Sequence, residues 1–571
     1  MARDEDLPRW VLPACLTAAL AARLWGIGHG FPDFVTGDER VLVKETVRFL
    51  NAATLEPGHY NYPALYGYLM AGGVWLAWGV GWLTDLGGIG PSVTFAHLFA
   101  PGQLALVGRI LSTAAGTGLV AVTFALGRRA YGTGAAIGGA CFAAWSTVLV
   151  TQSRFALPDV TMALFAVAAC LVSVQLSRQG GTRTYLAAGV LAGLAISTKY
   201  NAGVVVAGLV AAHLLRIHRD GGALLDRRAI AAGVGLLTAF LAGSPYWLIA
   251  PGRYWQGILD VTSNLRFSLA PSSWPRLALL ASLARIELVW AVLALLGAIH
   301  ALRRRTAADL VLLAVLLPGF LYLGSWPKGG VHYALYLLPL AGVMAGRWLA
   351  EVAAGRWRRW VLPGLVLASL PQAVATVEEG AALRRPDPRS EAARWMEATI
   401  PDGTVLGVYR IDYCPPLKGD VHRAFLRERL AASAARPELT RRLQELDRGL
   451  RIYTQLSLEY FGEQPVVPPE YAAGIDLSDP KTAETFRRTW MEYPELKTYG
   501  VRYLILPSAG YARFLDNEPP PAGTPAHYYY TRNRQYLTGL LDGADPRYRQ
   551  VRVFSDPGHP QAGRIVLLEV R

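Results

Sequence analysis

Residues 103–150 read QLALVGRILSTAAGTGLVAVTFALGRRAYGTGAAIGGACFAAWSTVLV, which is two apolar runs separated by the basic pair Arg128-Arg129. Each run reaches the roughly 20 residues that a helix needs to cross the hydrocarbon of a bilayer. Basic residues in a short loop between two such runs are typical of the cytoplasmic side of a membrane. This stretch predicts two consecutive membrane-spanning helices.

The composition of the whole chain extends this prediction. Of its 571 residues, 52% are hydrophobic and 17% are charged, and the mean hydropathy is +0.26. A soluble globular protein carries about 25% charged residues. The hydrophobicity excludes a disordered chain, and four cysteines are too few for a disulfide scaffold. The net charge of +14 lies largely in short loops between apolar runs, which indicates a membrane lipid environment and no nucleic-acid partner.

Further apolar runs of this kind recur through the first 380 residues. The first run follows an acidic start and has no clean cleavage site behind it, so we expect an uncleaved anchor. The candidates for membrane-spanning helices are residues 9–28, 62–83, 103–127, 131–150, 158–177, 184–198, 200–217, 228–250, 278–301, 307–325, 331–351 and 357–377.

Basic clusters between these runs assign the two sides of the membrane. The positive-inside rule places all five on the cytoplasmic side, together with the N-terminus. The alternating loops and everything after residue 378 are then extracytoplasmic, and we expect an integral, multi-pass protein of the plasma (inner) membrane. The clusters are Arg128-Arg129, Arg178 with Arg183, Arg216 to Arg228, Arg303 to Arg305, and Arg356 to Arg359.

The run at 62–83 leaves two topologies open, because it either crosses the membrane or lies along the interface. We favour the interfacial alternative, since the run includes Pro63, is rich in Gly and Tyr, and carries its Trp residues at one end. The predicted fold class is therefore a polytopic α-helical membrane protein. It has about eleven transmembrane helices within residues 1–380 and interfacial helices in an outer loop at 29–100.

The composition changes beyond residue 385. Residues 384–389 read as a linker, and residues 385–571 as a soluble extracytoplasmic α/β domain. Helical spacing predicts a helix at 390–400. Runs of β-type residues predict strands at 404–411, 451–456, 502–506 and 564–570.

Ionisable residues near the outer surface are the candidates for function, because a membrane makes each charge expensive. Asp38 and Glu39 follow the first run and open an amphipathic stretch, where they could cap the helix or abstract a proton. Arg154 and Asp159 share a second outer loop, where Asp159 could simply open a helix after Pro158. Both pairs carry a structural and a catalytic interpretation.

Cations form the second group of candidates. Each alone could be an interfacial side chain that reaches to water. Acids and several cations on one side of the membrane indicate instead a site for an anionic lipid and a proton transfer. The cations in the predicted outer loops are His59, Lys199, Arg266, Lys328 and His332.

The ordered set of motifs resembles the polyprenyl-phosphate-sugar-dependent glycosyltransferases of the GT-C fold, which include protein O-mannosyltransferases and the aminoarabinose transferase acting on lipid A. The resemblance covers roughly residues 10–350. The matching pieces are Gly37-Asp38-Glu39, Asn61 to Tyr66, Gly108-Arg109 through Gly127-Arg128-Arg129, Ser153 to Asp159, Ser197 to Asn201, Ser244-Pro245-Tyr246, and His332-Tyr333 through Leu338-Pro339-Leu340.

The resemblance implies a general base and a set of groups for the phosphate of the sugar donor. Asp38 is the implied base, with Glu39 and Asp159 beside it, and the sugar's configuration inverts. Where the aminoarabinose transferase carries Lys-Pro-Pro, this chain has Tyr62-Pro63-Ala64, so the phosphate-binding lysine of that motif is missing. The groups that we expect to bind the phosphate in its place are Lys328, Arg266, Lys199, His59, Tyr62, His332 and Arg154.

The expected function is an integral membrane glycosyltransferase that moves a sugar from a polyprenyl-phosphate donor to a hydroxyl of a glycan, lipid or protein. We expect no cofactor and no metal, because the histidines are isolated and no Asp-x-Asp motif stands in the outer loops. The alternative is a secondary transporter of an anionic or lipid-linked substrate. That alternative usually brings two related halves, which this sequence does not show.

Overall fold

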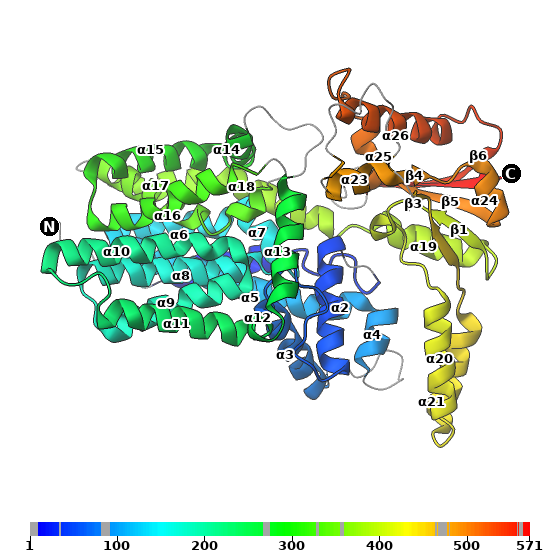
Figure 1. Ribbon diagram of the computed structural model, residues 1–571, viewed down its shortest axis with the longest axis horizontal. Coiled ribbons are helices and arrows are strands. Elements are labelled where there is room, and N and C mark those ends of the chain that lie inside the picture. Colours follow the sequence, from blue (N-terminus) through cyan, green and yellow to red (C-terminus); the bar gives the residue numbers. More distant parts are fainter. Residues whose placement is uncertain are drawn as a thin grey trace.

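The computed structural model of the chain describes residues 10–33, 36–81, 92–266, 275–326, 330–353, 359–462, 465, 477–478, 480–556, 558 and 563–571. Lys328 and the side chain of Arg266 lie outside this description. Figure 1 shows a bundle of long helices at one end of the molecule and an α/β domain at the other.

Helices form at each of the eleven ranges that we predict to span the membrane. Four of the described helices are long and apolar enough to cross a bilayer on their own, and α6 and α7 make a fifth span if taken together. The bundle helices are α1 (Val11–Leu24), α5 (Pro101–Tyr131), α6 (Thr133–Trp145), α7 (Thr147–Ser153), α8 (Asp159–Arg178), α9 (Thr182–Thr198), α10 (Val205–Asp220), α11 (Arg227–Gly243), α15 (Leu288–Arg304), α16 (Ala307–Leu323), α17 (Leu338–Val352) and α18 (Val361–Leu383).

A buried arginine lies at the break between α6 and α7. The two helices meet at an angle of 54°. Arg23 of α1 is fully buried there and donates to the carbonyl oxygens of Ala143 and Ala144, at 2.8 and 3.1 Å. These are carbonyls of the last turn of α6 that have no partner within the helix. A buried arginine thus stabilises the end of one half of the broken span.

A second group of helices lies at the end of the bundle that faces the α/β domain. Figure 1 shows α2 and α13 running across the long direction of the bundle there, with α3 and α4 beside α2. Helix α3 forms within the run at 62–83, whose interfacial placement stays a prediction. This group comprises α2 (Gly37–Asn51), α3 (Leu65–Gly79), α4 (Val93–Phe99), α12 (Tyr246–Ile249), α13 (Pro251–Arg266) and α14 (Pro275–Ile286).

Helix α2 is amphipathic, as its spacing predicts. Val43 and Val47 are buried, whereas Lys44 and Arg48 on the opposite face are exposed. The helix begins with a capping box, in which the side chain of Glu39 accepts from the backbone N–H and the hydroxyl of Thr36. The apolar face packs on α3, α4 and α5, which holds the first turn of α2 against the bundle.

The C-terminal domain is built on a five-stranded mixed sheet with the order β2-β1-β5-β7-β6. Strand β1 pairs in parallel with β2 and β5, while β7 pairs antiparallel with β5 and β6. All four predicted strands form, and β6 was not predicted because its arginines obscure the alternation. The strands are β1 (Val405–Val408), β2 (Thr454–Ser457), β5 (Val501–Pro507), β6 (Tyr548–Ser555) and β7 (Arg564–Val570).

Helices cover both faces of this sheet. Ile505 and Leu567 point to α19 (Pro388–Thr399), which contributes Met396 to the same cluster. Leu504 and Leu568 point to the other face and pack on α25 and α26. Successive strand residues face opposite sides, so both faces need apolar cover. The remaining elements are α20 (Asp420–Ala432), α21 (Pro437–Gly449), β3 (Glu459–Phe461), α23 (Pro480–Arg487), β4 (Arg488–Trp490), α24 (Tyr493–Thr498), α25 (Ser508–Leu515) and α26 (Pro525–Leu541).

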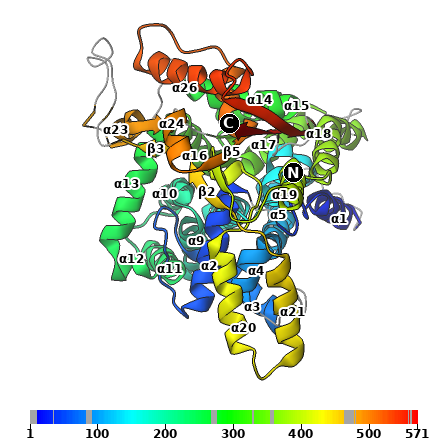
Figure 2. The same ribbon diagram turned by 90° about the vertical axis from the view of Figure 1, so that its right-hand side faces the viewer.

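The hairpin of α20 and α21 reaches back to the segment at 29–100 that we predict to be an outer loop. Figure 2 shows the hairpin beside α4. The His422 Nε2 lies 3.1 Å from the carbonyl oxygen of Leu98, and the rings of Phe99 and Phe425 are 6.4 Å apart. The domain therefore contacts the same outer segment that carries Asp38.

Candidate functional site

A small cavity of about 120 Å³ opens where α2 and α8 meet the loops before α3, after α9 and before α17. Five of the residues predicted for the site come together in its wall. Its lining residues are Asp38, Leu42, Tyr62, Gln152, Leu157, Pro158, Asp159, Lys199, His332 and Tyr333.

The polar residues of the cavity wall lie at the ends of helices or in the turns next to them. Asp38 is in the first turn of α2, and Asp159 is the first residue of α8, after Pro158. Lys199 ends α9 in an extended conformation, and His332 lies in a short 3₁₀ turn before α17. Ends of helices rather than their middles supply the site, so all of these side chains reach the same surface of the bundle.

Lys199 and Asp159 form a buried ion pair. The Lys199 Nζ lies 2.6 Å from the Asp159 Oδ1, and the two side chains are 9% and 4% exposed. The same ammonium lies 4.7 Å from the ring centre of Tyr333 and 5.6 Å from that of Tyr62. Aromatic faces attract a cation, so the lysine is held by one carboxylate and two rings.

Asp38 differs from the other acids of the region. Its side chain is exposed to the cavity and has no hydrogen bond or ion pair among the residues that the structure describes. Burial, together with the carboxylates of Asp159 and Asp38, raises the pKa of Tyr333 to about 12, and the same causes raise the pKa of Tyr62. The two phenols therefore stay protonated hydrogen-bond donors beside a free carboxylate.

His332 completes the wall on the side of α17. Burial lowers its pKa, and the nearby Asp159 opposes that effect. Its ring centre lies 4.2 Å from that of Tyr333. A neutral imidazole at this position offers one donor and one acceptor rather than a fixed charge.

Glu39 lies outside the cavity, although it follows Asp38 directly. It is fully buried, and its two oxygens accept from the guanidinium of Arg109 at 2.8 Å each. It also accepts from the backbone N–H of Ala156 at 2.8 Å. Burial would raise the pKa of Glu39, but the ion pair with Arg109 outweighs it and lowers the pKa to about 2. This carboxylate holds α2 to α5, and we assign it no proton transfer.

Arg154 and His59 also lie outside the cavity wall. Arg154 is buried and donates to Glu379 at 2.9 Å and to the carbonyl oxygens of Ala22 and Thr376 at 2.9 and 2.8 Å. It joins α1 and α18 instead of facing the site. His59 stacks on the outer side of Tyr62, with ring centres 6.0 Å apart. Of the predicted cations described by the structure, Lys199 and His332 reach the cavity.

Sequence reasoning missed three residues. Tyr333 and Gln152 line the cavity, and Arg109 holds Glu39 in place. Arg109 could have been found from the sequence, because an arginine inside an apolar run needs a buried partner. No comparable signal marks Gln152, whose place in the wall depends on the break between α6 and α7.

An apolar cavity of about 210 Å³ lies between α14, α15, α16 and α17. Its wall includes Trp290, Phe320 and Leu338, and the carboxylate of Glu287 lies at its edge. The Oε1 of Glu287 accepts from the hydroxyl of Ser146 at 2.7 Å. Leu338 of its wall is the first residue of α17, four residues after the turn Val331–Ala334 ends.

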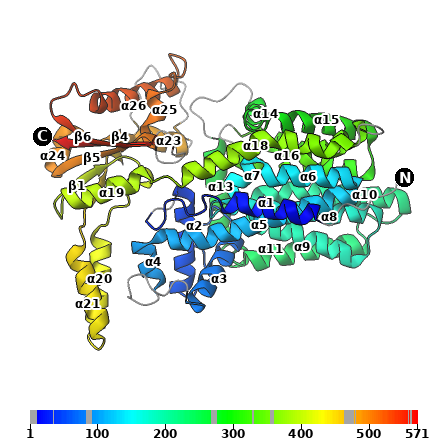
Figure 3. The ribbon, with the colours of Figure 1, turned by 180° about the vertical axis from the view of Figure 1, so that it is seen from behind.

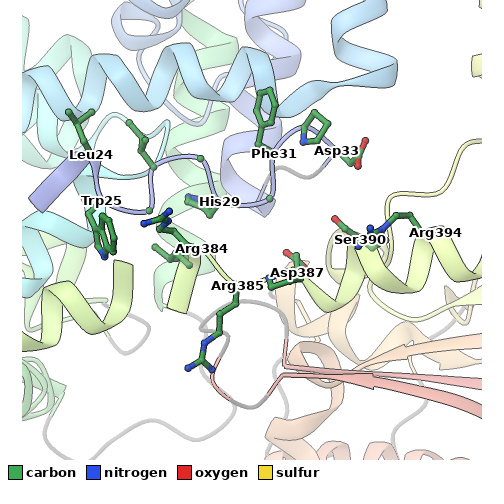
Figure 4. A pocket seen from close by; sticks show the side chains of 17 residues that line it. Leu24, Trp25, His29, Phe31, Asp33, Arg384, Arg385, Asp387, Ser390 and Arg394 are labelled. Carbon is green, nitrogen blue, oxygen red and sulfur yellow. Dashed lines mark hydrogen bonds between the residues drawn. The ribbon is translucent and has the colours of Figure 1, made fainter. Parts of the chain in front are cut away.

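A third cavity, of about 640 Å³, lies at the junction of the bundle and the C-terminal domain. Figure 4 shows it between the loop after α1 and the segment from α18 to α19. Arg384, Arg385 and Arg394 line it from one side, and Asp33 from the other. The segment predicted as a linker thus contributes directly to the contact between the two parts.

Comparisons with known proteins agree with this architecture. Residues 93–249 match the family model of dolichyl-phosphate-mannose-protein mannosyltransferases. No curated protein matches the sequence.

Solved structures resemble the chain over almost its whole length. ArnT from Cupriavidus metallidurans in the apo state is 14% identical with a TM-score of 0.53, and the match covers 97% of both chains. ArnT from the same organism bound to undecaprenyl phosphate is 13% identical with a TM-score of 0.51, covering 98% of this chain and 97% of that one. The Archaeoglobus fulgidus oligosaccharyltransferase in complex with zinc and sulfate is 12% identical with a TM-score of 0.51, covering 96% and 79%.

These matches show the fold. The chain is an integral membrane protein with the GT-C fold, in which a helical bundle carries a C-terminal domain that contains a sheet.

Proposed function

We propose that this protein transfers a sugar from a polyprenyl-phosphate donor to an acceptor hydroxyl at the extracytoplasmic face of the membrane. The observation that carries the proposal is which of the three carboxylates, Asp38, Glu39 and Asp159, has a positively charged partner. Asp159 is neutralised by Lys199 and Glu39 by Arg109, while Asp38 faces the cavity without a partner among the described residues. One free carboxylate in an otherwise neutralised site is suited to accept a proton.

Asp38 acts as the general base in this proposal. It accepts the proton of the acceptor hydroxyl while that oxygen attacks the anomeric carbon of the sugar. The bond from that carbon to the phosphate oxygen breaks, and the polyprenyl phosphate leaves as an anion. Attack from the face opposite the leaving phosphate inverts the configuration, and no covalent intermediate forms on the protein.

Positive charge and hydrogen-bond donors must meet the leaving phosphate. Lys199 is the cation of the cavity, and the hydroxyl of Tyr62 is a neutral donor beside it. Since Asp159 balances Lys199, further charge is needed, and we assign it to Arg266 and Lys328. Lys328 stands four residues before His332 in the sequence, and Arg266 ends α13. A well-placed donor of this kind contributes about 3–4 kcal/mol to the transition state.

The prenyl chain of the donor needs an apolar environment next to the site. We assign it to the cavity between α14 and α17, because its wall is almost wholly hydrophobic and includes Leu338, which follows the turn of His332 in the sequence. The likeness to ArnT bound to undecaprenyl phosphate supports a donor of this chemical class.

The two ends of the bundle support the proposed orientation in the membrane. Figures 1 and 3 show the connections from α10 to α11 and from α15 to α16 at the end away from the C-terminal domain. These connections carry the basic residues Arg219, Arg227 and Arg303. The positive-inside rule places that end, together with the N-terminus, in the cytoplasm, so that the cavity and the C-terminal domain are outside.

The test measures release of free undecaprenyl phosphate from undecaprenyl-phosphate-linked sugars, offered as a panel to the detergent-solubilised full chain with a crude envelope fraction as acceptor. Wild type should release it with at least one sugar. Asp38→Asn should release it about 10²–10⁴-fold more slowly, with an unchanged melting temperature. Undiminished release by Asp38→Asn would remove Asp38 from the base role, and uptake of the intact lipid without release would favour a transporter.

A further inference from the structure

The C-terminal domain carries a cavity that the proposed transfer reaction does not use. It measures about 510 Å³ and is formed by residues of β4, α26 and β6, with Glu492 just before α24 and the loop before β6. Its wall consists of Thr489, Trp490, Glu492, Arg532, Gln535, Tyr536, Gly539, Leu540, Asp545, Arg547 and Tyr548. We propose that this cavity binds an uncharged saccharide chain.

Aromatic surface is the first argument. Trp490 and Tyr536 stack with ring centres 4.3 Å apart and planes inclined by 19°. Trp490 is 5% exposed, while Tyr536 and Tyr548 are only partly buried at the cavity. Tyrosine presents an apolar ring face and a polar tip together, which suits a ligand with both C–H and O–H surfaces. A sugar ring has this character.

The balance of charge is the second argument. Two cations, Arg532 and Arg547, and two acids, Glu492 and Asp545, line the wall. Arg547 pairs with Asp545 through two guanidinium nitrogens, with the shortest contact at 2.6 Å. The wall therefore offers donors and acceptors in similar number without net charge. An anionic headgroup would gain little from such a wall, whereas a polyol can use both kinds of group.

The cavity is held in shape before any ligand arrives. The Trp490 Nε1 donates to the Oδ1 of Asn533 at 3.1 Å, and the hydroxyl of Tyr536 donates to the carbonyl oxygen of Met491 at 2.7 Å. Arg532 donates to the hydroxyl of Thr489 at 2.9 Å. Side chains that are already fixed lose little conformational entropy when a ligand binds. This lower cost favours binding of a ligand that buries little apolar surface.

The position of the cavity indicates an extended ligand. Figure 1 shows α24 and β6 at the side of the domain that faces away from the bundle. A saccharide that engages both this cavity and the site around Asp38 must span the domain, as a glycan chain does. Its identification as the acceptor rests on the proposed transferase function, whereas saccharide binding itself does not.

Gly539 supplies the decisive variant. It lies in the wall of the cavity within α26, and a Cβ added there would meet no atom within 4 Å. Gly539→Ala should fold at least as well as wild type, because alanine is the better helix former. Gly539→Trp places a large side chain at the wall without a clash at its Cβ and should reduce the space for a ligand.

The experiment measures binding of the purified full chain in detergent to arrayed neutral oligosaccharides of mannose, galactose, glucose and arabinose. Arrayed uronic-acid and sulfated oligosaccharides and serine- and threonine-containing peptides serve as comparison probes. We expect wild type and Gly539→Ala to bind a neutral oligosaccharide with similar affinity. We expect Gly539→Trp to bind it at least tenfold more weakly at an unchanged melting temperature.

Each other outcome overturns the proposal. These are no binding to neutral oligosaccharides at millimolar concentration, preferred binding of the charged or peptide probes, or undiminished binding by Gly539→Trp. Binding needs no sugar donor, so its failure leaves the transferase proposal intact. Failure of undecaprenyl phosphate release by wild type, with saccharide binding retained, would instead contradict the proposed function alone.

Discussion

The Lys199 Nζ lies 2.6 Å from the Asp159 Oδ1, so a lysine at the end of α9 and an aspartate at the start of α8 form an ion pair within the wall of the cavity. This pairing decides the roles of the neighbouring groups. Among the residues that the structure describes, it leaves Asp38 as the carboxylate of the cavity wall without a partner, and it makes Lys199 a cation fixed in place.

The pair predicts the behaviour of a double variant. Lys199→Met should destabilise the protein by roughly 3–5 kcal/mol, because Asp159 is left buried without its counter-charge. Lys199→Met/Asp159→Asn should recover most of the stability and none of the activity, since the cation is still absent. Thermal unfolding in detergent and release of undecaprenyl phosphate measure the two effects. Normal activity in the double variant would show that Lys199 does not serve the phosphate.

Asp38 and Glu39 should respond in opposite ways to loss of charge. Asp38→Asn should slow the reaction about 10²–10⁴-fold at unchanged stability, whereas Glu39→Gln should lower stability because Arg109 keeps a buried, unmatched charge. The pKa of Glu39 is lowered to about 2 from 4.5. Its contribution to stability is therefore complete above pH 4.5 and is lost as the pH falls towards 2. Melting curves at pH 7 and pH 4 test this; a Glu39→Gln variant as stable as wild type at pH 7 would contradict it.

His29 predicts a pH dependence at milder acidity. Burial, with the positive charge of Arg109, lowers its pKa from 6.5 to about 3. Between these two pKa values the unfolded chain therefore binds a proton at His29 that the folded protein does not bind. The free energy of unfolding falls as the pH drops below 6.5, by at most about 1.4 kcal/mol per pH unit. His29→Gln should show a shallower loss between pH 6.5 and 5 than wild type. Equal slopes for the two proteins would show that this histidine is protonated in the folded state.

Arg154 should act on stability and not on donor binding. Its planar guanidinium serves Glu379 and the carbonyl oxygens of Ala22 and Thr376 at once, which a lysine cannot reproduce. Arg154→Lys should lower the free energy of unfolding by about 1–3 kcal/mol and leave the KM for the lipid-linked sugar unchanged. Arg266→Gln is the matched comparison and should raise that KM without loss of stability. A raised KM in Arg154→Lys would return this residue to the phosphate site.

Metal independence is a further prediction, since the proposed reaction relies on a carboxylate base and side-chain cations. Dialysis against EDTA should leave undecaprenyl phosphate release within twofold of the untreated protein. Loss of activity that Mg²⁺, Mn²⁺ or Zn²⁺ restores would require a metal at the site, with Asp38 and Asp159 as the first ligands to test.

The helical bundle, the amphipathic α2 and four strands of the sheet could be predicted from the sequence, because each depends on a local period of apolar residues. The same holds for the gathering of Asp38, Tyr62, Asp159, Lys199 and His332. A membrane makes charges rare, and basic loops assign the side on which the remaining ones lie. The predicted common side grouped the charged residues, whereas Tyr62 was predicted from the family resemblance. The same argument also grouped Glu39, Arg154 and His59, which lie outside the cavity wall.

Which charge meets which partner was decided by the tertiary structure alone. Successive residues of a helix point about 100° apart, so Asp38 and Glu39 face different surroundings, and only the packing of α2 on α5 shows that Glu39 turns inward to Arg109. The same is true of Arg154, which shares an outer loop with Asp159 yet joins α1 to α18. Sequence reports the cost of a buried charge; the partner that offsets this cost comes from a distant segment, and only the folded chain brings the two together.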